Sequence, residues 1–99
     1  MDSGLDEKTK NKIVGIISVL IPDAKIYLFG SRARGSHKRY SDIDIALDAG
    51  KPLENVDVDE VKCMLNESNI HQLIDVLDFH SVDLAMQESI MQERVIWKS

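Results

Sequence analysis

Apolar residues at helical spacing predict three helices in this chain. The clearest set lies on one face of a helix over residues 6–20, closed by Pro22, and consists of Ile13, Ile16, Ile17 and Leu20. A similar spacing predicts a helix over residues 55–67. A last helix is expected from Ser81, a residue suited to the N-cap position.

Strand-like segments alternate with these helices. In segment 42–48, three aspartates and Ala46 alternate with Ile43, Ile45 and Leu47, which predicts a strand with one apolar face. Residues 25–29 are rich in β-formers and end at Gly30, where a second helix is expected to begin, and residues 73–79 form another apolar strand candidate. Residues 95–97 are expected to form a tail. Alternating helices and strands predict an α/β (α+β) fold in which layers of helices surround a small sheet.

Composition and charge limit the number of domains and the kind of partner. The 99 residues are enough for one domain, 1–99, whose core must come from the 43% apolar residues. The net charge of −5 argues against an extended nucleic acid as partner, because such binding needs many basic side chains. Four basic residues nevertheless fall between Arg32 and Arg39, which favours a small anion such as a triphosphate, although a solvated helix face would also explain them.

The cysteine count and the apolar runs exclude several other classes. Cys63 is the only cysteine, so neither an intrachain disulfide nor a cysteine-based zinc site can form. Residues 1–8 lack the features of a signal peptide, and no apolar run reaches the ~18 residues of a membrane span. We therefore expect a cytoplasmic protein without a membrane partner.

A Gly-Ser pair at the end of the first strand is a candidate phosphate turn. Backbone N–H groups at such a turn bind phosphate oxygens, and Gly30 allows close approach. Ser31 can add its hydroxyl, and Arg32 and Arg34 can add planar donors, although Ser31 can equally serve only as a helix cap. A P-loop is excluded, because Gly35 is not followed by Lys and Ser or Thr.

Three aspartates form the candidate metal site. Asp42 and Asp44 stand two apart on a strand, so both carboxylates project from one face and can share one or two Mg²⁺ ions. Asp75 lies within an apolar run, where a carboxylate is costly unless a cation, a proton or hydrogen bonds compensate it. Strand parity places Asp78 on the opposite face, and Asp75 is the predicted ligand because it lies deeper in the run.

These motifs carry a family resemblance. Gly30-Ser31, ten intervening residues and Asp42-x-Asp44, within GSRARGSHKRYSDIDIAL, resemble the minimal nucleotidyltransferase (MNT) group of the DNA polymerase β-like superfamily. Segment 74–79 resembles the strand that carries the third carboxylate of that superfamily, and Ala33-Arg-Gly35 points to the MNT branch.

The resemblance implies a fold and a reaction. The fold is the polymerase β-like nucleotidyltransferase fold, a small mixed sheet flanked by helices, and the reaction transfers AMP from ATP with Mg²⁺, two ions being expected. By resemblance, the triphosphate is held by Gly30 and Ser31, and the metals by Asp42 and Asp44. Asp75 would ligate one metal and help to deprotonate the attacking hydroxyl.

The resemblance also implies a partner chain. Larger relatives carry a helical domain after the catalytic one, and none is expected after Ser99. MNT proteins are typically paired with a helical HEPN toxin, and the MNT antitoxin is thought to bind the toxin and adenylylate one of its tyrosines. Two alternatives stay open: an antitoxin that neutralises its HEPN partner by binding alone, or nucleotidyl transfer to a small molecule or an RNA end. A homo- or hetero-oligomer fits any of these.

Overall fold

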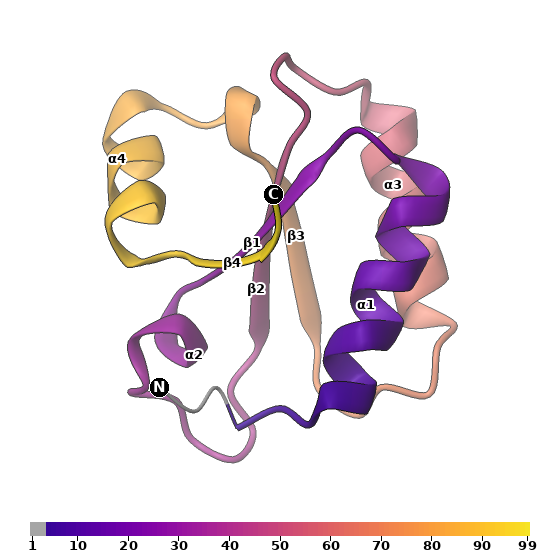
Figure 1. Cartoon of the computed structure of the whole chain (residues 1–99), viewed down its shortest axis with the longest axis vertical. Helices are drawn as coiled ribbons and strands as arrows, with labels where there is room; N and C mark the ends of the chain where they lie inside the picture. The colour runs from indigo at the N-terminus through magenta and orange to yellow at the C-terminus, as the bar shows by residue number, and fades with distance from the viewer. Residues whose placement is uncertain (1–3) are drawn as a thin grey trace.

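A mixed sheet forms the centre of the protein (Figure 1), as seen in a computed structural model that describes residues 4–99. Within these residues the sheet has four strands in the order β3-β2-β1-β4. The strands are β1 (Lys25–Phe29), β2 (Ile43–Asp48), β3 (Ile74–Asp78) and β4 (Val95–Lys98). β1 pairs antiparallel with β2 and β4, whereas β2 and β3 are parallel. The predicted small mixed sheet is confirmed.

Helices cover both faces of this sheet. Figure 1 shows α1 and α3 on one side of it and α2 and α4 on the other. The helices are α1 (Glu7–Leu20), α2 (Ser31–Arg34), α3 (Asn55–Asn66) and α4 (Leu84–Glu93), and a 3₁₀ turn η1 (Phe79–Ser81) follows β3. α3 provides the crossover that the parallel strands β2 and β3 require. Within residues 4–99, no helix has both the length and the apolar character needed to cross a membrane.

The core is divided by the sheet into two clusters. The larger cluster lies under α1 and α3, where burial of apolar side chains supplies most of the driving force for folding, and includes Ile13, Ile17, Ile26, Leu28, Ile43, Ile45, Leu47, Val61, Leu65 and Val76. The smaller cluster lies under α4 and consists of Tyr27, Phe29, Ala46, Phe79 and Ile90. β2 alternates as predicted, because its isoleucines and Leu47 face the larger cluster.

Most predicted elements agree with the structure to within a residue or two. The first strand is observed at Lys25–Phe29, as predicted, and β2 begins one residue later than the predicted segment. The helix predicted over residues 55–67 is α3, and the strand predicted over residues 73–79 is shortened to Ile74–Asp78. Local periodicity was therefore sufficient for these elements.

The C-terminal prediction was wrong in two respects. Ser81 lies in the 3₁₀ turn, and Asp83 caps α4 instead, with its carboxylate accepting a 2.9 Å hydrogen bond from the Met86 amide. The segment expected as a tail is β4, an edge strand in which Ile96 pairs with Tyr27. β4 has only four residues, two of them exposed and two half-buried, so it lacks the alternation that marks a strand in sequence.

Candidate active site

The Gly-Ser turn joins β1 to α2 and requires its glycine. Gly30 has φ 76° and ψ −157°, a backbone region that is essentially restricted to glycine. A Cβ atom at this position would overlap Oδ2 of Asp44 and lie 3.1 Å from its Cγ. Gly30 also occupies the N-cap position of α2, so Ser31 is the first helical residue rather than the cap. The alternative that Ser31 only caps the helix is therefore wrong.

Strand register brings the predicted carboxylates together. Asp44 and Asp75 are paired residues on the parallel strands β2 and β3, so their side chains lie side by side on one face. Ile43, which stands between Asp42 and Asp44, is fully buried in the larger core cluster. The two aspartates therefore project from the other face of the strand. The turn at Gly30 lies against this group through Asp44.

The electrostatics of Asp44 indicate a site that favours a cation. Burial raises the pKa of Asp44, and the carboxylates of Asp75 and Asp42 raise it further, while the Arg34 guanidinium acts in the opposite direction. A carboxylate surrounded by other carboxylates is stabilised when a cation binds among them.

The donor set fits Mg²⁺ held jointly with a nucleotide. Among residues 4–99, no three carboxylate, imidazole or thiol groups converge closely enough to hold a metal by themselves. Mg²⁺ usually takes only one or two protein carboxylates and completes its octahedron with water and substrate phosphates. Asp42, Asp44 and Asp75 therefore have the right chemistry and the right neighbour, a candidate phosphate turn.

Asp75 lies beside Asp44, but it is not buried. Asp75 is exposed, and Asp78 is the buried aspartate of β3, with 6% of its surface accessible. Our argument that Asp75 lies deeper in the apolar run was therefore wrong. β3 is an edge strand, and the apolar cluster under α4 reaches Leu77 but not Asp75.

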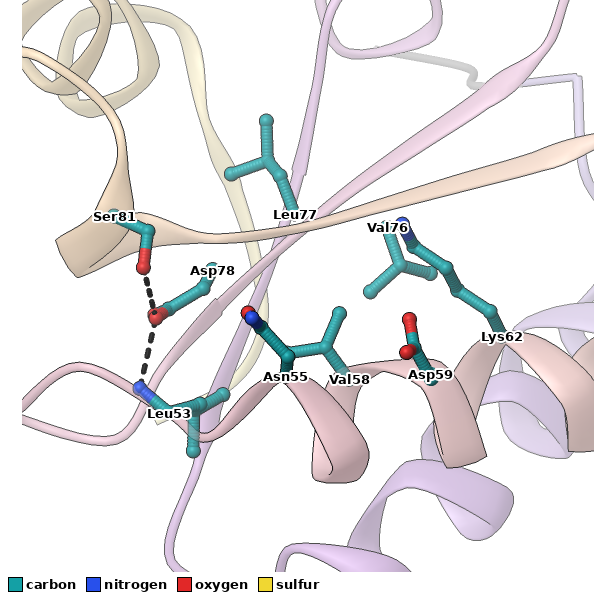
Figure 2. Close-up of a pocket in the computed structure, with 9 residues that line it drawn as sticks. All are labelled: Leu53, Asn55, Val58, Asp59, Lys62, Val76, Leu77, Asp78 and Ser81. Atoms are coloured by element: carbon teal, nitrogen blue, oxygen red, sulfur yellow. Dashed lines mark hydrogen bonds between the residues drawn. The ribbon is translucent and has the colours of Figure 1, made fainter.

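Asp78 has a structural position on the other face of the sheet. Figure 2 shows it beside a pocket of about 210 Å³ between α3 and β3, where it accepts hydrogen bonds from the Leu53 amide (2.8 Å) and the Ser81 hydroxyl (2.6 Å). The His80 amide donates a third bond at 3.1 Å. These bonds offset the cost of burying the carboxylate. Asp78 thus ties the end of β3 to the loop before α3, on the face opposite to Asp44 and Asp75.

Arg32 is buried and bonded to backbone carbonyls, which differs from the exposed, phosphate-facing guanidinium that we expected. Its side chain is buried, with 2% of the residue accessible. The guanidinium donates to the Ser41 carbonyl at 3.1 and 3.0 Å and to the Arg39 carbonyl at 3.4 Å. An arginine with five donors in a fixed plane is well suited to such bracing. Arg32 thereby fixes the segment that leads into Asp42.

Arg34 does face the site, and it has a partner that the sequence did not reveal. Its NH1 group donates to Oε2 of Glu93 at 2.8 Å, and the other oxygen of that carboxylate accepts from the Gly30 amide at 3.1 Å. The Glu93 charge also contributes to the raised pKa of Asp44, after burial and the two aspartates. No local pattern points to Glu93, because it lies 63 residues from Gly30 in sequence.

An open hollow of about 530 Å³ borders Asp42. Its lining consists of Arg39, Tyr40, Asp42, His71, Gln72 and Leu73. Tyr40 is 85% exposed and Leu73 is 72% exposed, so two large apolar groups flank the hollow without being part of the core. The Asp42 side of the three-aspartate site is therefore open to solvent.

Fold and site together define a nucleotidyltransferase of the polymerase β type. The family model described as "Polymerase beta, Nucleotidyltransferase" matches residues 11–99, and the chain belongs to this family. Within the family, the chain is similar to the protein adenylyltransferase MntA of Shewanella oneidensis, with 33% identity over 95 residues, which cover 94% of this chain and 68% of that relative. The resemblance to the MNT group is confirmed.

Several solved structures that contain a similar chain are toxin–antitoxin complexes. One, determined with AMP-PNP, has a chain with a TM-score of 0.76 and 31% identity, and the match covers 89% of this chain and 71% of that one. Another contains a tri-AMPylated Shewanella oneidensis HEPN toxin with its MNT antitoxin; its matching chain has a TM-score of 0.73 and 28% identity, with 94% and 71% coverage. These matches confirm the polymerase β-like nucleotidyltransferase fold.

Proposed function

We propose that this protein is an antitoxin that transfers AMP from ATP, with Mg²⁺, to a tyrosine hydroxyl of a HEPN toxin. The observation that carries the proposal is the pairing of Asp44 with Asp75 beside the turn at Gly30. This arrangement brings cation ligands next to a candidate phosphate site. The names of the similar proteins support the same reaction and the same kind of partner.

Each site residue has a role in this proposal. Gly30 and Ser31 hold the triphosphate, with Arg34 as the side-chain cation beside them. Gly30 contributes by allowing close approach, because its own amide donates to Glu93. Arg32 acts from within, because it fixes the backbone before Asp42 rather than facing the nucleotide. Asp42, Asp44 and Asp75 bind the metal, two Mg²⁺ ions being proposed, and these ions would supply charge neutralisation at the attacking and leaving oxygens.

The chemistry balances as a single displacement. The tyrosine oxygen forms a bond to the α-phosphorus, the bond from that phosphorus to the bridging oxygen breaks, and pyrophosphate leaves. Asp75 takes up the proton of the hydroxyl, a role for which its exposed carboxylate is accessible. Arg34 donates to the phosphate oxygens as the nucleotide is held in line.

Transfer of label from α-³²P-ATP to a purified HEPN partner tests this proposal. We expect the wild-type protein to label the partner in the presence of Mg²⁺, and Asp42→Asn and Asp44→Asn to abolish labelling. Asp23→Asn is a matched control, since Asp23 is an exposed aspartate in the turn between α1 and β1. Mass spectrometry should then find AMP on a tyrosine of the partner.

Two outcomes would replace the proposal with one of the alternatives. If the double variant Asp42→Asn, Asp44→Asn protects cells from the toxin as well as the wild-type protein does, the protein neutralises its partner by contact. If label appears on RNA or on a small molecule and not on protein, the acceptor is wrong. Equal labelling by wild-type protein and Asp44→Asn would refute the catalytic site itself.

A further inference from the structure

Glu93 contacts both Gly30 and Arg34, the first and last residues of the segment proposed to bind the triphosphate. Oε1 accepts from the Gly30 amide at 3.1 Å, and Oε2 accepts from NH1 of Arg34 at 2.8 Å. The Glu93 side chain is 19% exposed, whereas that of Arg34 is 52% exposed. The carboxylate is therefore largely enclosed, and the guanidinium that it holds still reaches solvent.

The position of Glu93 is set by the packing of α4. Glu93 is the last residue of this helix, which is anchored to the sheet by Ile90, a fully buried residue of the smaller core cluster. The next strand, β4, pairs with β1, which ends at Phe29 just before the turn. The carboxylate thus comes from a firmly held element, and it fixes Gly30 and Arg34 relative to that element.

We propose that Glu93 is a positioning residue that preorganises Arg34 and the Gly30 turn for the nucleotide triphosphate, an inference that rests on the proposed function. A guanidinium carries five N–H donors, and the bond to Glu93 uses one nitrogen, so donors remain for phosphate. An arginine that is already held in place loses less side-chain freedom when the nucleotide binds. For Glu93 to aid binding, this gain must exceed the repulsion between the Glu93 carboxylate and the phosphates, and the affinity of a Glu93→Gln variant measures the balance.

The experiment measures binding of AMP-PNP with Mg²⁺ by calorimetry, alongside label transfer from ATP. We expect Glu93→Gln to weaken binding about three- to tenfold, because the amide oxygen keeps the Gly30 contact while the ion pair to Arg34 is lost. The KM for ATP in the transfer reaction should rise by more than kcat falls, since Glu93 acts on nucleotide binding through Arg34 and the aspartates are untouched. Glu88→Gln is the matched control, because Glu88 is an exposed glutamate of the same helix.

A double-mutant cycle separates positioning from a general structural effect. In an Arg34→Ala background, Glu93→Gln should change the affinity by less than about twofold, because its effect passes through Arg34. Equal weakening in both backgrounds, or unchanged or tighter binding by Glu93→Gln alone, would overturn the inference. Glu93→Gln is used rather than Glu93→Ala because it keeps the size of the side chain, so the test does not depend on whether the alanine variant folds. If wild-type protein transfers no label but the binding pattern holds, the proposed function fails and the inference about Glu93 stands.

Discussion

Substitution of Gly30 by alanine tests whether the turn and the carboxylates form one unit. The backbone at Gly30, with φ 76° and ψ −157°, lies in a region that costs other residues about 1–3 kcal/mol. The new Cβ would also overlap Oδ2 of Asp44, which must move away. Asp44 is paired on β2 with Asp75 on β3, so it cannot move without disturbing the proposed metal ligands.

The backbone strain and the displacement of Asp44 should each have a measurable effect. We expect Gly30→Ala to lower the free energy of unfolding by about 2 kcal/mol, as measured by urea denaturation. Transfer of label to the partner should fall at least about 100-fold at saturating ATP, because a displacement of about 1 Å in a reacting constellation has that effect. The loss in rate should therefore persist at temperatures where the variant is fully folded.

Gly15 offers a matched control within the same chain. It lies in α1, and a Cβ there would meet nothing within 4 Å. Gly15→Ala should raise the free energy of unfolding by about 1 kcal/mol, because alanine is the better helix former, and leave label transfer unchanged. If Gly30→Ala transfers label at the rate of Gly15→Ala, the close contact between turn and carboxylate has no role in the reaction.

Three further variants test other parts of the structure. Asp44→Asn should raise the thermal midpoint without Mg²⁺ while abolishing transfer, because burial and neighbouring carboxylates raise the pKa of Asp44; a lower midpoint would contradict this. Asp78→Ala should lower the free energy of unfolding by about 3 kcal/mol in urea denaturation, since a buried acceptor of three hydrogen bonds is lost. A decrease of less than about 1 kcal/mol, the value of one exposed hydrogen bond, would contradict its structural role. Burial raises the pKa of Asp48, but hydrogen bonds from the Gly50 amide and from His80 lower it, and the net result is a lowered pKa. The stabilisation from Asp48 is thus present above about pH 4 and lost as the pH falls through the lower folded value, and Asp48→Asn should remove this part of the acid sensitivity.

Elements with strong local patterns could be predicted from the sequence. Ile43, Ile45 and Leu47 all face the larger core cluster, so alternation identified both β2 and its buried face. The same alternation placed Asp42 and Asp44 on the other side, which is half of the candidate site. α1 was equally clear, because Ile13 and Ile17 are fully buried at helical spacing.

Features that depend on strand order could not be predicted in this way. Whether Asp75 or Asp78 is buried depends on what covers each face of the edge strand β3. The loop before α3 bonds to Asp78, and the apolar cluster under α4 ends before Asp75. Neither is encoded in the local run. The orientation of Arg32 depends on carbonyl groups of a loop that has no periodicity. The expectation that Asp75 is the more buried of the two was wrong, and its register with Asp44 is what supports it as a candidate ligand.

The contact from Glu93 follows from the same strand order. Because β4 returns to pair with β1, the end of α4 is brought to the point where β1 gives way to the turn. The site residues thus come from the turn after β1 and from α2, β2 with the residue before it, β3 and α4. The pairing of the strands sets the distances between these elements. A change that shifts β4 along β1 should therefore affect Arg34 through Glu93, although β4 itself contributes no residue to the site.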